Sequence, residues 1–198
     1  MKRWWTTTGV ICVFLAATAI PAQAAEEVAT QDAVREAALE PGAVDPEYLA
    51  AVEPVAQAVA EEYGIPASVT AAQSILESGW GESRLAVAHR NFFGFKCVAG
   101  RPGPIASGCH EYPTTECTPE CQPATAAFRV YPSMKDSFRD YGRLISTSKY
   151  YAHALPFADD AKVFIREVAK SYATDPKYAG KVIRLMDQHD LYRLDSPE

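Results

Sequence analysis

The most chemically informative stretch of the sequence is residues 72–81, AQSILESGWG, in which a glutamate precedes a glycine-flanked tryptophan by three residues. The apolar spacing before it predicts a helix that ends close to Glu77. A helix C-terminus carries partial negative charge, and partial burial beside the Trp80 indole would further disfavour an anionic carboxylate. A carboxyl group kept protonated near neutral pH is what a glycosidase needs to protonate a leaving oxygen. Trp80 would offer a flat apolar face on which a sugar ring can stack.

The N-terminus has the parts of an export signal. Lys2 and Arg3 supply the positive start, residues 10–20 are mostly apolar, and residues 22–24, Ala-Gln-Ala, form a small-x-small cleavage site. We therefore expect residues 1–24 to be a signal peptide and the mature protein to be secreted, to the cell wall, the periplasm or the outside. A retained N-terminal anchor is the alternative, although the apolar run is short for a membrane span.

The composition of the remaining 174 residues narrows the class of protein. Loss of Lys2 and Arg3 lowers the formal net charge from −6 to −8, and no basic patch with interleaved aromatic residues is visible. Such an acidic chain is a poor candidate for non-specific nucleic-acid binding. No later stretch is long enough to span a membrane. The length suits one domain with its own core, which we expect to be monomeric.

Four cysteines remain after removal of the signal, namely Cys97, Cys109, Cys117 and Cys121. An even number in an exported chain implies two disulfides, for which three pairings exist. We favour Cys97–Cys109 and Cys117–Cys121 because these pairs are sequential and close small loops. The gaps between the cysteines lack the paired short spacers of zinc fingers, and the histidines form no zinc-binding pair at helical spacing, so a metal site is not expected.

Local signals divide the chain into a flexible N-terminal segment, residues 25–44, and a domain, residues 45–195. The domain opens with Asp45-Pro46, a helix cap followed by proline, and Gly64 would end that first helix. A second helix is expected from a Ser68 cap to residue 78, with a polar side facing away from the core, and a short third one over 83–88.

The middle of the chain, residues 93–132, is rich in Gly, Pro, Thr and Cys and predicts a small disulfide-pinned β-hairpin lobe, with a strand over 126–131. Helical periodicity returns after Ser133, again after a cap at Asp159, and again from Asp175-Pro176. The expected fold class is mainly α, a lysozyme-like α+β arrangement in which a helical bundle and the small β-lobe flank a substrate cleft.

Four segments together resemble one known family. They are QSILESGWGES (73–83), NFFGFK (91–96), FR-x-Y with S-x-x-DY (128–141), and SYATDPKY (171–178). In this order they are similar to the bacterial β-N-acetylglucosaminidase family, the mannosyl-glycoprotein endo-β-N-acetylglucosaminidase-like group of flagellar rod muramidases and autolysins, glycoside hydrolase family 73. The resemblance covers about residues 48–194. It implies hydrolysis of the β-1,4 bond after N-acetylglucosamine in peptidoglycan.

The resemblance also assigns roles to residues. Glu77 matches the general acid of the family, and Tyr172 matches a tyrosine that lines the substrate cleft. A second carboxylate lies in a "T-x-E" segment of the family, which Thr114-Thr115-Glu116 fits best, with Glu111 and Glu120 as rivals. On the residues themselves, Phe92 and Phe93 would supply one core ring and one cleft ring, and we assign Phe93 to the substrate.

We therefore predict a peptidoglycan glycan-strand hydrolase that needs no cofactor. Inverting, retaining and N-acetyl-assisted mechanisms all stay open, since the sequence does not choose among them. Two other interpretations are kept. One is a lytic transglycosylase or muramidase, which the lack of a Gly-x-Met-Gln segment after the glutamate argues against. The other is a non-catalytic cell-wall-binding module, which the intact Glu77 argues against.

Overall fold

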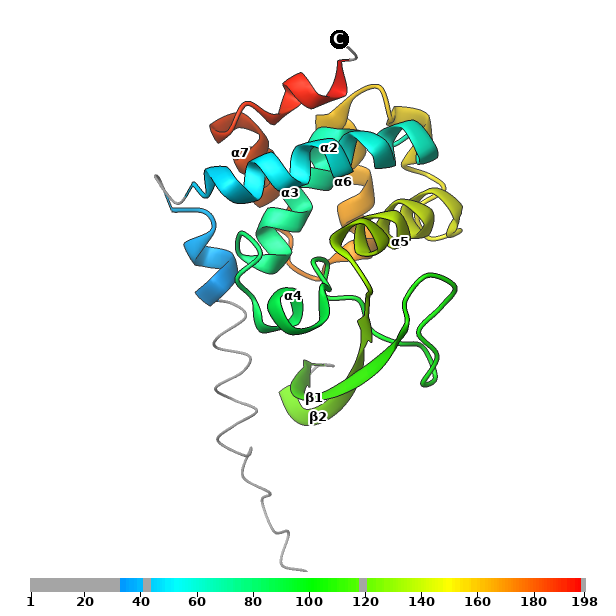
Figure 1. Ribbon diagram of the computed structural model, residues 1–198. Helices are drawn as coiled ribbons and strands as arrows, with labels where there is room; N and C mark the ends of the chain where they lie inside the picture. Colours follow the sequence, from blue (N-terminus) through cyan, green and yellow to red (C-terminus); the bar gives the residue numbers. More distant parts are fainter. Residues whose placement is uncertain (1–32, 41–43, 118–120, 197–198) are drawn as a thin grey trace, which may run out of the picture.

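Helix α3 (Ala67–Ser78) lies at the centre of the fold, and every one of its residues is buried. The computed structural model describes residues 33–40, 44–117 and 121–196, except for the side chains of 115–123, and it surrounds α3 with helices (Figure 1). These are α2 (Pro46–Tyr63), α4 (Arg84–His89), α5 (Met134–Thr147), α6 (Ala161–Tyr172) and α7 (Tyr178–Gln188), with the short 3-10 helices η1 (Leu155–Phe157) and η2 (Leu191–Asp195). Helix α3 packs against α2, α6, α7 and η2.

Helix α2 begins and ends where its local signals predict. The Asp45 carboxylate accepts hydrogen bonds from the backbone N–H groups of Glu47 and Tyr48, at 2.9 and 3.1 Å, and Pro46 is the first helical residue. Gly64 follows the last turn in the left-handed conformation, with φ of 64°, which glycine adopts without steric cost. Both ends are fixed by residues adjacent in sequence, so the prediction is confirmed here.

The start of α3 differs from the expectation. Its N-cap is Pro66, and Ser68 lies inside the helix, where its N–H and hydroxyl both donate to the Asp195 carboxylate, at 2.8 and 2.6 Å. The expected polar side is buried as well. The Thr70 and Ser74 hydroxyls donate to the backbone carbonyls of Pro66 and Ala71, at 3.1 and 2.7 Å, which satisfies hydroxyls that would be costly to bury unpaired.

The later helices are in the predicted places, with shifted starts for two of them. Helix α6 is capped by Asp160 rather than Asp159, through hydrogen bonds to the N–H groups of Lys162 and Val163. Helix α7 begins at Tyr178, because Asp175 instead forms a turn in which its side chain accepts from Lys177 N–H at 2.8 Å. The predicted starts of α6 and α7 therefore differ from the observed ones by one and three residues.

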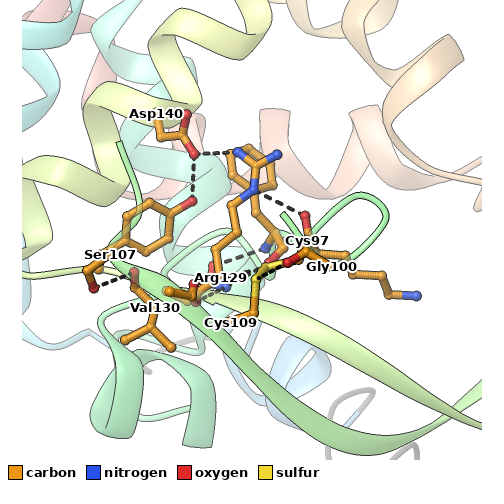
Figure 2. The surroundings of a disulfide bond; sticks show 12 residues. Cys97, Gly100, Ser107, Cys109, Arg129, Val130 and Asp140 are labelled. Carbon is orange, nitrogen blue, oxygen red and sulfur yellow. Dashed lines mark hydrogen bonds and ion pairs between the residues drawn. A yellow bond between two sulfur atoms is a disulfide. The ribbon is translucent and has the colours of Figure 1, made fainter. Parts of the chain in front are cut away.

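The β-lobe is one antiparallel hairpin of β1 (Gly108–Cys117) and β2 (Cys121–Val130), whose register pairs Gly108 with Val130 and Cys117 with Cys121. The predicted Cys97–Cys109 disulfide is confirmed, with an S–S distance of 2.07 Å (Figure 2). It ties the segment before the hairpin to β1. The second predicted pairing, Cys117–Cys121, falls on side chains outside the described part of the chain. The expected mainly helical fold with a small disulfide-linked β-hairpin is therefore confirmed.

Two polar residues attach this lobe to the helices. Arg129, on β2, reaches the buried Asp140 carboxylate on α5 (Figure 2). Asn91 holds the loop after α4, since its amide donates to the carbonyls of Phe95 and Arg129 at 2.9 and 3.0 Å, and its carbonyl accepts from Phe95 N–H at 3.0 Å. Asn91 thus has a structural role. Two of the four sequence motifs thus serve to place the lobe.

Residues 33–40, expected to tether an export signal to the domain, instead pack against it. Residues 33–37 are helical and lie beside the end of α3 (Figure 1). Ala38 and Leu39 belong to the hydrophobic core, at 2 and 4 % exposure. None of the helices in the described part of the chain combines the length and hydrophobicity that a membrane crossing requires. The predicted export signal, residues 1–24, lies outside the described residues.

Candidate active site

A cleft of about 720 Å³ lies where the helical bundle meets the base of the β-lobe. Its walls come from the end of α3, the segment 93–98 before the hairpin, the turn 172–175 between α6 and α7, and the first turns of α7. Helix α3 runs through the centre of the bundle and ends at the cleft. Residues that are far apart in sequence meet there.

Glu77 occupies the last turn of α3 and lines this cleft. It is buried, at 6 % exposure, and each of its oxygens has a protein partner. Oε1 accepts a hydrogen bond from the Tyr178 hydroxyl at 2.8 Å, and Oε2 accepts one from Nη2 of Arg35 at 2.5 Å. The helix end predicted for Glu77 is confirmed, and the side chain faces a cleft.

The Tyr178 hydroxyl belongs to a buried chain of hydrogen bonds that runs through the core. Gln73 lies one turn before Glu77 on α3, and its amide N–H donates to the Tyr178 hydroxyl at 2.8 Å. The amide carbonyl of Gln73 in turn accepts from the Tyr141 hydroxyl at 2.5 Å. Burial raises the pKa of Tyr178 well above its ordinary value, and the nearby Glu77 raises it further. Tyr178 is therefore a hydrogen-bond donor to Glu77 throughout the physiological pH range.

The contact with Arg35 was not expected from the sequence. The sequence predicted a carboxyl group influenced by the helix end and the Trp80 indole. The structure places the Arg35 guanidinium 2.5 Å from Oε2 of this carboxyl group. Burial opposes the charge on Arg35, but the Glu77 carboxylate more than offsets it and raises the pKa of Arg35.

Trp80 is not among the residues that line the cleft with Glu77. Its ring is buried, at 7 % exposure, and makes edge contacts with Tyr48 and His189, at centroid distances of 6.2 and 4.9 Å. It adopts a left-handed backbone conformation, with φ of 58°, directly after Gly79. Because the chain reverses here, the indole points back into the core, and we do not include Trp80 in the substrate site.

Phe93 and Tyr172, both predicted to contact substrate, do line the cleft. Phe93 is 3 % exposed, and its ring stacks on Tyr141 at 4.3 Å. Tyr172 stacks on Tyr178 at 5.4 Å, and its hydroxyl donates to the Phe93 carbonyl at 3.4 Å. The structure thus brings these two residues together beside Glu77. Phe92 is buried against Phe138 and Tyr48 in the core.

The candidates for a second carboxylate lie on the hairpin. Glu116 is in β1 opposite Gln122, but its side chain lies outside the described part of the chain, as does the whole of Glu120. Glu111 is exposed on β1 and is not among the residues that line the cleft. Asp175 does line the cleft, and a hydrogen bond from Lys177 N–H, together with the positive charge of Lys181, lowers its pKa.

Sequence reasoning missed several residues of this cleft. Tyr178 is the last residue of the recognised SYATDPKY segment, but nothing in the sequence indicates its contact with Glu77. Arg35 lies in residues 25–44, for which the sequence predicted a flexible segment, and Asp175 was assigned to a helix start. Tyr178, Arg35 and Asp175 all reach the cleft through contacts between segments that are distant in sequence. Among the described residues, His, Cys, Asp and Glu side chains form no group of three or more that could hold a metal ion.

Comparisons with known proteins agree with this arrangement. Residues 53–191 match the family model described as mannosyl-glycoprotein endo-beta-N-acetylglucosaminidase. The peptidoglycan hydrolase FlgJ of Pseudomonas aeruginosa is 35 % identical over 153 residues, which cover 74 % of this chain and 37 % of that protein. A probable N-acetylmuramidase of Lactococcus lactis is 32 % identical over 158 residues, which cover 75 % of this chain and 34 % of that protein. The chain thus spans less than half the length of these relatives.

Solved structures show the same fold. The catalytic domain of the autolysin Auto from Listeria monocytogenes aligns with a TM-score of 0.66 and 27 % identity, over 85 % of this chain and 97 % of that one. A glycoside hydrolase domain of Salmonella typhimurium FlgJ aligns with a TM-score of 0.58 and 33 % identity, over 73 % of this chain and 96 % of that one. The match of the family model over most of the chain, with relatives above 30 % identity, establishes that this chain belongs to the glucosaminidase family.

Proposed function

We propose that this chain is an exported peptidoglycan hydrolase that cleaves the β-1,4 bond after N-acetylglucosamine, with Glu77 as the general acid. The observation that carries the proposal is the position of Glu77. Glu77 lies in the last turn of the central helix and lines a cleft of about 720 Å³. Its carboxyl group accepts a hydrogen bond from the Tyr178 hydroxyl at 2.8 Å. A proton donor whose orientation is fixed by a buried network is suited to a defined acceptor oxygen.

The other walls of the cleft suit a glycan with acidic substituents. Tyr172 and Phe93 supply aromatic surface for the apolar faces of sugar rings. Lys96 and Lys181 also line this cleft, and the Lys181 ammonium pairs with Asp175 at 3.3 Å. Peptidoglycan strands carry carboxylates on their stem peptides, so cationic side chains at the cleft favour peptidoglycan over an uncharged β-1,4 glucosamine polymer.

In the proposed reaction the protonated Glu77 gives its proton to the glycosidic oxygen while the bond from that oxygen to the anomeric carbon breaks. Positive charge develops on the sugar, and water finally adds to the anomeric carbon. In an inverting route a second carboxylate activates that water from about 6.5–9.5 Å away, and in a retaining route it attacks from about 5 Å. The substrate N-acetyl group offers a third route. Glu116 is our candidate from the family resemblance, and Asp175 is the described cleft carboxylate besides Glu77.

Export is part of the proposal because the chemistry belongs outside the cytoplasm. The signal-like residues 1–24 support it, and so does the Cys97–Cys109 disulfide, since such bonds persist in oxidising compartments. Detection of a mature protein that begins at Ala25 in the culture medium or periplasm would test this part.

Mass spectrometry of the fragments released from purified cell walls tests the cleaved bond. We expect new N-acetylglucosamine reducing ends. N-acetylmuramic acid reducing ends would favour a muramidase, 1,6-anhydro ends would favour a lytic transglycosylase, and binding without release would favour a wall-binding module. Glu77→Gln should reduce release at least 100-fold, because general acid catalysis contributes about 10²–10⁴-fold. Glu82→Gln, at an exposed glutamate of the same motif, is the matched control and should retain activity.

The second carboxylate is tested with three neutral variants, Glu116→Gln, Glu111→Gln and Asp175→Asn. The residue that completes the mechanism should lose activity by about 10²-fold or more, whereas the others change it little. Proton NMR of the first product formed distinguishes inversion from retention at the anomeric carbon. If all three variants keep full activity, Glu120→Gln is tested next, and full activity of that variant too favours the N-acetyl-assisted route.

A further inference from the structure

The N-terminal segment of the described chain, residues 33–40, reaches into the cleft through Arg35. The guanidinium donates to Oε2 of Glu77 at 2.5 Å, across 42 residues of sequence, and Arg35 lines the same cleft as Glu77. Tyr178 already donates to Oε1. Both oxygens of the proposed acid are therefore occupied by donors from the protein, one of them from outside the helical bundle.

Apolar packing holds the segment in this position. Ala38 and Leu39 are buried in the core, at 2 and 4 % exposure. Val34 lies so close to Gly79 that a Cβ added to that glycine would come within 2.2 Å of the valine Cγ1. A weaker ionic contact joins Glu36 to Lys181 of α7, at 4.0 Å. The contact between Arg35 and Glu77 is thus one part of a packed interface rather than an isolated surface ion pair.

This interface opposes the chemistry proposed for Glu77. A general acid must carry a proton and must be able to meet the glycosidic oxygen. The Arg35 guanidinium keeps its positive charge in proteins and lies 2.5 Å from Oε2 of Glu77, where it occupies the position that a leaving-group oxygen would approach. With residues 33–40 in place, Glu77 therefore lacks the open position that the reaction requires.

We propose that residues 33–40 form an autoinhibitory plug, with Arg35 in the place of the substrate at Glu77, and that displacement of this segment activates the enzyme. The inference rests on the proposed function of Glu77. It predicts that the full chain works below its capacity and that loss of the Arg35 contact alone releases activity. Displacement would expose Ala38 and Leu39, so the plugged form is the resting state.

The test compares the full-length mature protein with Arg35→Gln, which keeps a side chain of similar length but removes the charge. We expect the initial rate of reducing-end release from purified cell walls to rise about tenfold or more, with the same products. Leu39→Asp, which unseats the segment from the core, should raise the rate by a second route. Arg139→Ala is the matched control, because it removes an exposed arginine–glutamate pair with Glu62 on the outer side of α5 and should leave the rate unchanged.

Binding of a tetramer of β-1,4-linked N-acetylglucosamine, measured by isothermal titration calorimetry, gives a readout independent of turnover. The tetramer should bind Arg35→Gln more tightly than the wild type. If the wild type releases saccharides and neither Arg35→Gln nor Leu39→Asp is faster, the plug is excluded while the proposed function stands. If none of the proteins releases saccharides, the proposed function fails, and equal tetramer affinities in wild type and Arg35→Gln would then exclude the plug as well.

Discussion

The Arg129 guanidinium on β2 and the Asp140 carboxylate on α5 form a buried ion pair that joins the β-lobe to the helical bundle (Figure 2). Asp140 also accepts from the Tyr131 hydroxyl at 2.8 Å and from Arg143 at 2.9 and 3.1 Å. Arg129 further donates to the Lys96 carbonyl at 3.1 Å, in the segment that lines the cleft. The placement of one cleft wall therefore depends on the Asp140 carboxylate.

Asp140→Asn should strongly destabilise the protein. The variant leaves Arg129 buried without its counter-charge, and breaking such a pair costs about 3–5 kcal/mol. Urea unfolding followed by circular dichroism measures the loss. Glu62→Gln, which removes the partner of the exposed Arg139, should change the midpoint little because water solvates both groups. Equal effects of the two substitutions would contradict a special role for the Arg129–Asp140 pair.

Two helical glycines should respond in opposite directions to substitution by alanine. A Cβ at Gly142 on α5 would lie 2.4 Å from Cδ2 of Tyr63 and 2.7 Å from Cγ1 of Val59, both on α2. We expect Gly142→Ala to cost about 1–3 kcal/mol through overpacking. A Cβ at Gly180 on α7 meets nothing within 4 Å, and Gly180→Ala should stabilise by about 0.5–1 kcal/mol. Thermal unfolding of both variants checks the sign of each change.

The parts of the fold that sequence predicted are those set by neighbouring residues. Asp45, Pro46 and Gly64 begin and end α2 through contacts within a few residues, and Ser83 and Ser133 cap α4 and α5 in the same way. The disulfide between Cys97 and Cys109 was predictable for a similar reason, since it closes a short loop. These features need no knowledge of the rest of the fold.

The parts that sequence did not predict depend on distant partners. Ser68 is a residue type that often caps helices, but here it lies inside α3 and donates hydrogen bonds to Asp195, near the other end of the chain. The burial of the polar side of α3 likewise requires Tyr141 and Tyr178 to satisfy Gln73. No local pattern places Arg35 beside Glu77, because the contact exists only once the segment packs on Gly79.

Stability should fall as the pH falls below the ordinary imidazole pKa of about 6.5. Burial lowers the pKa of His89, and the nearby His110 and Arg84 lower it further. The His89 ring also hydrogen-bonds the Tyr112 hydroxyl at 2.7 Å. Burial likewise lowers the pKa of His189. The unfolded chain therefore binds more protons than the folded one between the lowered and ordinary values, so the folded state loses stability through that window.

Unfolding midpoints measured from pH 7.5 to pH 5 check this sign. His89→Gln should flatten the decline, and the double variant with His189→Gln should flatten it further. A decline of unchanged steepness in the double variant would show that carboxylates, rather than these two histidines, set the acid sensitivity.

Tyr178→Phe should lower turnover while leaving substrate binding nearly intact. The substitution removes the hydroxyl that donates to Oε1 of Glu77 at 2.8 Å and accepts from Gln73 at 2.8 Å. A hydrogen bond to a charged group contributes about 1.5–3 kcal/mol, so the loss of this positioning contact should reduce kcat about 10–100-fold. Because the ring remains, its stacking on Tyr172 persists, and KM should change little. Tyr192→Phe, which removes an exposed hydroxyl bonded to Asp187, is the control and should retain full activity.

Measuring kcat and KM across pH separates this positioning role from a loss of folding. When kcat is corrected for the folded fraction, measured by circular dichroism at each pH, destabilisation no longer contributes. Loss of the Tyr178 donor should still shift the pH profile of kcat, since the hydroxyl contacts the proton-carrying group itself. Introducing Tyr178→Phe and Tyr192→Phe into the Arg35→Gln protein shows whether the loss of kcat persists once the contact with Arg35 is gone. A kcat that matches the parent protein at every pH would mean that Glu77 does not depend on Tyr178 for its orientation.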